Sequence, residues 1–232
     1  MNAPRSKVRA FSRVASMLLA VAAISGCGVR LAPAPGVPVV PGPVPGAVGR
    51  EDGIQIIAYP DAWTASPPTL NAIVTPILVV IDNGGPAPLR LQHEDFALVT
   101  DDGTRLVALN PYEVTGFASV PASGPVVAAS PRFSFSLGIG GYRGDRGRPY
   151  YYTDPFYDDL YYPISVQVPL PTPEMVQLAL PERTVEPGAR ATGFLYFDRV
   201  KRKAKRVDFT ARLVNASTGE QIGTVTIPFV TE

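Results

Sequence analysis

The chain has 232 residues, 46% of them hydrophobic, and its 21 Lys and Arg against 20 Asp and Glu give a formal net charge of +1. Four of the basic residues and none of the acids lie within residues 1–26, so the rest of the chain carries a net charge of −3. That mildly acidic balance argues against a general nucleic-acid binder, and the single cysteine excludes an intrachain disulfide.

The N-terminal segment has the layout of an export signal. Its first 13 residues hold four basic side chains and no acid, and the apolar run Val14–Ile24 follows. The run of about 11 residues is too short to span a bilayer, which takes about 20, and it matches the apolar core of a signal peptide. Because Ser25 and Gly26 are small enough to enter a peptidase cleft, we predict cleavage between Gly26 and Cys27.

The motif Ile24-Ser25-Gly26-Cys27 resembles the lipobox of bacterial lipoproteins at all four positions: an aliphatic residue, a small residue, Gly or Ala, and Cys. The resemblance covers residues 1–27 and implies a covalent lipid on the sulfur of Cys27, with no other cofactor. In that family an Asp after the cysteine favours the inner membrane, so Gly28 implies the outer membrane. Two or more acyl chains hold a protein stably at a membrane. The alternative is an ordinary secretory signal followed by an unmodified cysteine.

Residues 27–50 are dominated by Pro, Gly, Val and Ala. Proline removes backbone donors and favours the extended polyproline II conformation. We therefore expect a linker here, either a semi-rigid stalk or a disordered tether. In both cases the folded domain, residues 51–232, would be held away from the lipid.

Short strand-like segments follow this region. Ile54–Tyr59 and Ala72–Asp82 are rich in β-branched residues, and Leu89 and Leu91 alternate with polar residues. Phe96–Thr100 and Thr104–Leu109 flank an Asp-Gly pair, which predicts a hairpin.

The C-terminal third contains the same kind of pattern. A second hairpin is predicted from Gly193–Val200 and Arg206–Val214, in which Phe209 and its alternate neighbours would share one face. Gln221–Val230 is the last predicted strand, and Pro228 places it at a sheet edge. A short helix is predicted over 174–180.

Seven or eight short strands with turn residues between them predict an all-β, antiparallel sandwich. The run Thr192–Phe197, which follows Pro187-Gly188, is similar to a late strand of immunoglobulin-like domains in secreted bacterial proteins. This resemblance implies an immunoglobulin-like β-sandwich without the cysteine pair of antibody domains.

The strand pattern is interrupted at about residues 131–171, which we interpret as an insertion. Seven of the ten tyrosines lie there, among glycines and arginines. These residue types are common in antibody recognition loops, and Arg adds cation–π and planar contacts. A low-complexity insertion that folds back on the sandwich is the alternative. The candidate partner contacts are Tyr142, Arg143, Tyr150, Tyr151, Tyr152, Tyr157, Tyr161 and Tyr162.

A run of basic residues lies where the second predicted hairpin should turn. One interpretation is a solvated turn whose charges protect a sheet edge. The other is contact with anionic lipid headgroups or a cell-wall polymer. The candidate residues are Lys201, Arg202, Lys203, Lys205 and Arg206.

The sequence contains no motif that predicts catalysis or metal binding. His93 is the only histidine, the acids Glu94 and Asp95 are merely its neighbours in sequence, and there is no G-x-S-x-G motif. Zinc-ligand spacing of Cys and His is also missing. The only tryptophan, Trp63, is expected to be a core or edge anchor.

These observations together predict a non-enzymatic, lipid-anchored module of the cell envelope that binds an envelope protein or a wall polymer, or has a structural role. The alternative is an envelope hydrolase that uses two carboxylates in a cleft, as glycosidases do.

Overall fold

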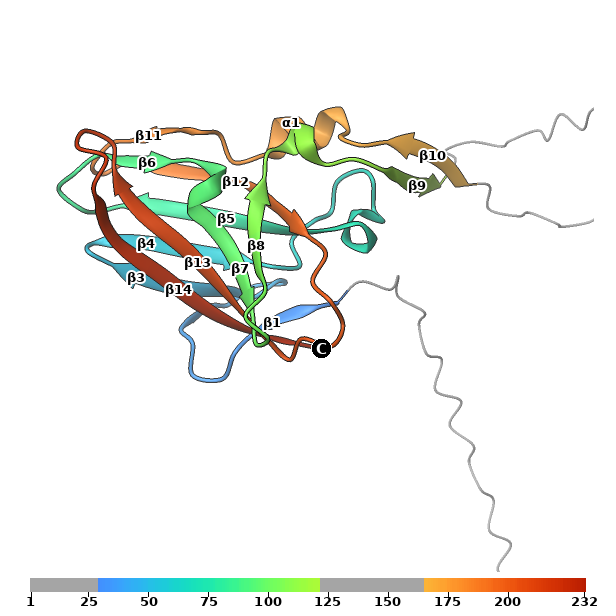
Figure 1. The fold of residues 1–232 in the computed structure, drawn as a ribbon, viewed down its shortest axis with the longest axis horizontal. Coiled ribbons are helices and arrows are strands. Elements are labelled where there is room, and N and C mark those ends of the chain that lie inside the picture. Colours follow the sequence, from blue (N-terminus) through green and yellow to red (C-terminus); the bar gives the residue numbers. More distant parts are fainter. Residues whose placement is uncertain (1–28, 122–164) are drawn as a thin grey trace, which may run out of the picture.

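The structure is a computed structural model that describes residues 29–121 and 165–232 (Figure 1). The predicted signal peptide, Cys27 and the eight candidate contact residues of the insertion lie outside these ranges. Fourteen strands are found in the described ranges: β1 Leu31–Pro33, β2 Val39–Val40, β3 Gly46–Glu51, β4 Ile54–Tyr59, β5 Val74–Asn83, β6 Leu89–Leu91, β7 Phe96–Thr100, β8 Arg105–Leu109, β9 Phe117–Pro121, β10 Ser165–Pro169, β11 Arg183–Val185, β12 Arg190–Asp198, β13 Arg206–Asn215 and β14 Gln221–Thr231. The helical elements are α1 Pro173–Leu178 and the 3₁₀ turns η1 Leu70–Ala72, η2 His93–Asp95 and η3 Pro111–Glu113.

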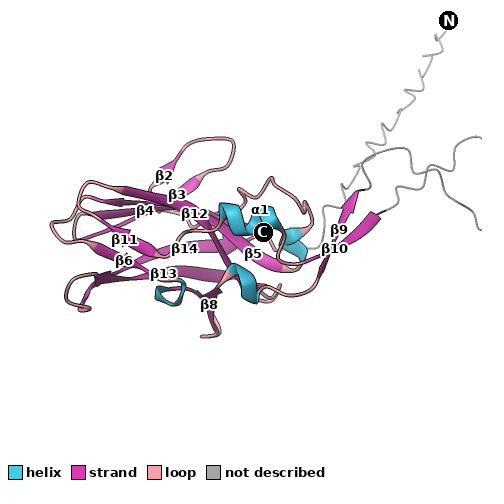
Figure 2. Cartoon of the chain, turned by 90° about the horizontal axis from the view of Figure 1, so that it is seen from above, coloured by secondary structure: helices cyan, strands magenta, loops and turns pink. Residues whose placement is uncertain are grey.

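The prediction of an all-β, antiparallel fold is confirmed. In the described part of the chain, twelve strands form one sheet with the main order β1-β14-β13-β7-β8-β12-β5-β4-β3-β2. Strand β6 pairs with both β13 and β11. The sheet curls until its two halves face each other and it is nearly closed. Figure 2 shows the two halves as two layers.

The main core fills the space between the two halves. Along β13 the side chains of Phe209, Ala211 and Leu213 are buried, while Arg212 between them is exposed. This alternation confirms the predicted inward face. A second, smaller cluster is centred on Trp63. The rings of Trp63 and Phe194 pack edge-on, with their centroids 5.0 Å apart. Trp63 is therefore a core residue, as predicted.

The prediction of a linker over residues 27–50 is wrong for residues 31–50. Strand β1 pairs with β14, with Leu31 opposite Thr231, and β3 pairs with β4, with Ala47 opposite Ala58. Leu31 and Ala47 belong to the main core. The prolines do not prevent this, because only Pro33 lies within a strand, at the end of β1 on an edge of the sheet, where a proline is tolerated; the other prolines lie in the connections between β1, β2 and β3.

Two predictions about strand neighbours are also wrong. β12 and β13 do not form a hairpin, because β12 pairs with β5 and β8 while β13 pairs with β14, β7 and β6. The basic run between them therefore crosses from one half of the sheet to the other. β14 is not an edge strand along its whole length, since β1 pairs with its outer side at residues 229–231, although residues 221–228 pair with β13 alone.

The other local predictions are confirmed. β7 and β8 form the predicted hairpin, in which Gly103 takes a positive φ of 81°. The short helix is α1, which begins after Thr172 and has Pro173 in its first turn. The Thr172 hydroxyl accepts a hydrogen bond from the backbone N–H of Met175, an N-cap that fits a helix start.

The predicted bounds of the insertion need correction, because β10 lies inside residues 131–171. β9 and β10 form a two-stranded ribbon, with Phe117 opposite Pro169 and Pro121 opposite Ser165. Figure 1 shows the ribbon extending from one end of the body. The segment 122–164 is therefore joined to the body through two paired strands.

Candidate functional site

The first described residues, the C-terminus and the basic run lie together at one end of the body. Val29, the first described residue, comes two positions after Cys27 in the sequence. The backbone N–H of Glu232 donates to the carbonyl of Arg30 at 3.0 Å, and that of Thr231 donates to the carbonyl of Lys205 at 3.2 Å. Cys27 is thus joined by a very short segment to the end that carries the basic turn.

The β9–β10 ribbon leaves the body at this same end. A hollow of about 330 Å³ is lined by Val29 and Arg30 on one side and by Thr69 on another. The Thr69 hydroxyl in turn donates to the carbonyl of Ser119 in β9 at 2.8 Å. Figure 1 shows the start of β1, the C-terminus and the ribbon all toward this end.

The five candidate residues of the basic run have different surroundings. Lys203 pairs with Asp102 at 2.9 Å and Arg206 pairs with Asp208 at 2.9 Å. A hydrogen bond from Thr100, together with Lys203, holds the pKa of the Asp102 carboxyl well below its usual range. Arg202 also has a partner. The structure therefore supports the interpretation of a charged turn whose positive charge is partly neutralised by neighbouring acids.

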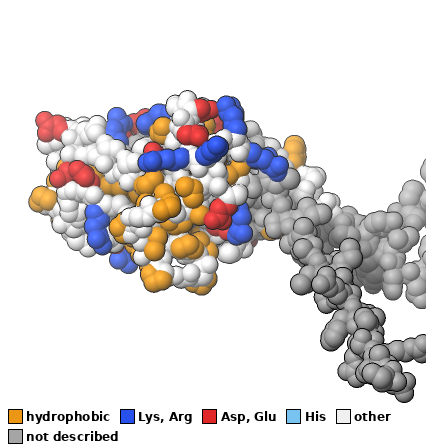
Figure 3. Space-filling model, turned by 90° about the horizontal axis from the view of Figure 1, so that it is seen from below, with side chains coloured by type: hydrophobic (Ala, Val, Ile, Leu, Met, Phe, Trp, Pro, Cys, Tyr) orange, Lys and Arg blue, Asp and Glu red, His pale blue; other side chains and the backbone are white. Residues whose placement is uncertain are grey.

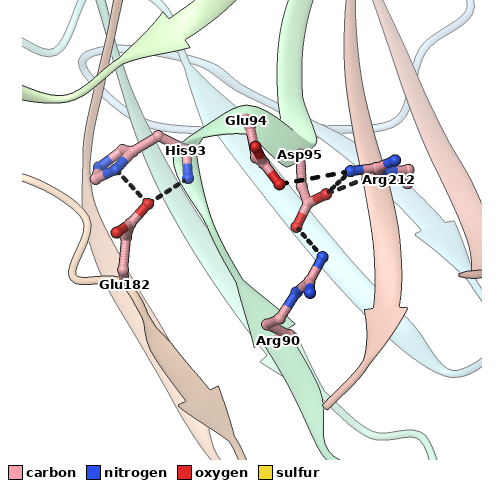
Figure 4. A network of polar contacts seen from close by, with 6 residues as sticks. All are labelled: Arg90, His93, Glu94, Asp95, Glu182 and Arg212. Carbon is pink, nitrogen blue, oxygen red and sulfur yellow. Dashed lines mark hydrogen bonds and ion pairs between the residues drawn. The ribbon is translucent and has the colours of Figure 1, made fainter. Parts of the chain in front are cut away.

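A polar network that the sequence did not predict lies beside η2, between β6 and β13 (Figure 4). Asp95 is only 1% exposed, and its Oδ1 accepts hydrogen bonds from Nε and Nη2 of Arg212 at 2.8 and 2.5 Å. Arg90 approaches the other carboxylate oxygen at 3.7 Å. The two arginines offset part of the desolvation cost of the Asp95 carboxylate, while its Oδ2 has no hydrogen-bond partner among the described residues. The network links η2 and β6 to β13.

His93 and Glu182 form a second polar pair nearby. The Glu182 Oε1 accepts from the backbone N–H and from Nδ1 of His93, both at 2.9 Å. The backbone hydrogen bond is the main reason that the pKa of Glu182 lies below its ordinary value. Because the ionised carboxylate is only an acceptor, Nδ1 donates to it, and the buried Nε2 has no hydrogen-bond partner among the described residues.

This pair borders a groove of about 580 Å³ with walls that include Tyr112, Leu178 and Phe194. A histidine oriented by a carboxylate can accept a proton from a neighbouring hydroxyl or thiol. The described residues that line the groove include no serine or cysteine. Its hydroxyl side chains are those of Thr192 and Tyr112, and neither is hydrogen-bonded to the histidine in the described part of the chain.

Replacing Glu182 by glutamine is expected to lower the free energy of unfolding at pH 6 by less than about 1 kcal/mol, since the Glu182 side chain is 47% exposed. A carboxyl with a lowered folded-state pKa stabilises the fold above its unfolded pKa, about 4.3, and this contribution is lost as the pH falls through the folded value. The deficit of Glu182→Gln should therefore shrink below about pH 4. Urea unfolding from pH 6 to pH 3 measures it.

Glu186→Gln is the matched control, because Glu186 is exposed on the same segment. Its unfolding free energy should follow that of the wild-type chain at every pH. A deficit in Glu182→Gln that is equally large at pH 3 would contradict the assigned role of the carboxylate.

Two carboxylates meet at one of the hollows in the described part of the chain. Asp52 and Glu220 both line a hollow of about 510 Å³ at the end of the body opposite the ribbon. Both residues are exposed. A glycosidase acid needs a raised pKa, which burial in an apolar environment provides, so this hollow does not favour the hydrolase alternative.

No family model matches the chain, and the searches of curated proteins and of solved structures returned no match. Residues 29–121 and 165–232 contain no group of three or more His, Cys, Asp or Glu side chains placed to hold a metal ion. Within the same ranges no helix has the length and apolar character needed to cross a membrane.

Proposed function

We propose that the chain is a non-enzymatic binding module of the cell envelope, anchored by lipid on Cys27 to the outer membrane. Its partner in this proposal is an envelope protein or a cell-wall polymer. The observation that carries the binding role is the β9–β10 ribbon, which holds the two ends of the Tyr- and Arg-rich segment side by side.

The ribbon is attached to the body by packing against the cluster around Trp63. Its five residue pairs run from Phe117 to Pro121, and Ala118 is buried in the cluster around Trp63 while Val168 packs against that cluster. Recognition residues are commonly carried on loops that a rigid scaffold positions. Seven tyrosines in a segment on such a stem therefore favour a contact surface over a low-complexity insertion that folds back on the body.

The binding role is tested by replacing residues 122–164 with a two-residue Asn-Gly turn, which preserves the paired stem. Neighbours are then identified by cross-linking in intact cells and mass spectrometry. A companion variant changes the seven tyrosines of the segment to serine. We expect both variants to lose the main cross-linked neighbour, since removal of aromatic anchors at an interface weakens binding on the order of 30-fold or more.

Tyr112→Ser is the matched control, because Tyr112 is 71% exposed and lies outside the segment. It should keep every neighbour. Capture of the same neighbours by the variant without residues 122–164 would refute the binding role, provided that this variant has the far-ultraviolet spectrum of a folded β protein.

The anchor is tested separately. Cys27→Ser should move the chain from the membrane fraction to the soluble fraction, and the N-terminal peptide of the wild-type chain should carry the mass of the lipid. A membrane-bound Cys27→Ser chain, or an unmodified cysteine in the native chain, would refute the anchor.

The immunoglobulin-like arrangement also stays a proposal. It is supported by the two facing layers and by the alternation of buried side chains along β13. The pairing of β8 with β12, which joins the layers at Tyr196 and Phe197, differs from two separate sheets. An experimental structure in which this pairing is absent would support the relationship.

A further inference from the structure

The seam between the two edges of the sheet is covered by residues 31–49. Strands β1 and β2 stand at opposite ends of the strand order, and the chain between them crosses the gap. None of the 19 residues has a charged or polar side chain. The segment therefore closes the nearly closed sheet with an entirely apolar surface.

Much of this segment is open to solvent. Val39 is 50% exposed, and several prolines between β1 and β3 are exposed as well. Figure 3 shows hydrophobic side chains gathered in the middle of the face seen from below, where Figure 1 places β1 and β3, with both basic and acidic side chains toward its margins. A continuous exposed apolar patch on a folded domain usually marks a contact with another surface.

The position of the patch limits what can cover it. If Cys27 is acylated, as proposed above, two residues separate the lipid from Val29, and they span at most about 7 Å. Arg30 and Leu31 are held directly on the end of β14. The body therefore has no stalk on which to leave the membrane.

We propose that the face formed by residues 31–49 lies against the lipid surface to which the chain is anchored. This inference rests on the proposed anchor at Cys27. Arg30 and Arg50 lie at the two ends of the segment, and both residues are exposed although Arg30 pairs with Asp61 and Arg50 donates to Gln55. Exposed guanidinium groups at the margin of an apolar face can meet phosphate headgroups. Pro33 in β1, and Pro38 and Pro41 on either side of β2, oppose the alternative in which a second copy adds a strand there.

A single free thiol tests the contact in the acylated full-length chain. Acylation converts the Cys27 thiol to a thioether, so Val39→Cys introduces the only free thiol. An environment-sensitive fluorophore is attached to it, and the chain is placed in vesicles of phosphatidylethanolamine and phosphatidylglycerol that contain nitroxide-labelled lipid. Val107→Cys is the matched control, because Val107 is 40% exposed on β8, in the other half of the sheet.

We expect lipid nitroxides to quench the fluorophore at residue 39 several-fold more than the one at residue 107. Equal quenching at the two positions, in chains that both float with the vesicles, would overturn the lipid-facing surface and leave the anchor intact. Failure of both chains to float would overturn the anchor and this inference together. Shielding of residue 39 that appears without vesicles and grows with protein concentration would assign the face to a second copy instead.

Discussion

Replacing Gly49 by valine is expected to lower the free energy of unfolding by about 3 kcal/mol, in the upper part of the range for overpacked cores. A Cβ at this position would lie 2.4 Å from Cγ1 of Val225 and 2.8 Å from Cγ1 of Ile227. Both side chains belong to β14, which faces β3 across the core. Urea unfolding of the Cys27→Ser chain measures the change.

The size of this loss of stability distinguishes a packed β3 strand from a solvated linker. In a solvated tether, valine in place of Gly49 would leave the folded domain unchanged. Gly42→Val is the matched control in the same segment, because a Cβ there would meet only the carbonyl oxygen of Val44 at 3.5 Å. We expect its effect to stay within about 0.5 kcal/mol. Equal stability of the two variants would contradict the packing of β3 on β14.

Asn83→Ala is expected to be comparably damaging, at about 3 kcal/mol, because one buried side chain makes three hydrogen bonds. Its Nδ2 donates to the carbonyls of Ala87 and Val185 at 2.9 and 2.8 Å, and its Oδ1 accepts from the N–H of Gly85 at 3.1 Å. Alanine leaves these three backbone groups without their partner. Because Asn83 is 1% exposed, water cannot readily replace the lost bonds.

Asn110→Ala is the control for loss of an amide that bonds the backbone at the surface. Its Oδ1 accepts from the N–H of Tyr112 at 3.0 Å in an exposed cap of η3. We expect a cost of about 1 kcal/mol there, as for other helix caps. Thermal or urea unfolding that ranks Asn110→Ala as the more harmful change would contradict the structural role of Asn83.

Local patterns in the sequence predicted the strands well where turn residues and alternation coincide. The Asp-Gly pair marks the β7–β8 hairpin, and the alternation along β13 identifies its buried face, because turn geometry and the two-residue period of a strand are local properties. The pairing partners of the strands could not be predicted in this way. β12 and β13 follow one another in the chain, yet they lie in opposite halves of the sheet, and nothing in the connecting basic run encodes that crossing.

The misreading of residues 31–50 has a specific cause. Alternating prolines suit a polyproline tether, but they suit an edge strand equally well, and composition does not distinguish these contexts. The His93–Glu182 pair shows why contacts between polar side chains could not be predicted from the sequence. Its partners are 89 positions apart, and they meet only because β11 pairs with β6. The sequence neighbours Glu94 and Asp95, by contrast, turn toward Arg212.

The way β1 is attached has a mechanical consequence. Three residue pairs hold it to the end of β14, and Leu31 is its only buried side chain. A pulling force on the N-terminus is borne first by those pairs, so we expect β1 to peel away before β3 does. The released stretch from residue 31 to residue 37, up to the pairing of β2 with β3, would then lengthen to about 24 Å. This segment would be an extensible tether under tension while the rest of the body stays folded.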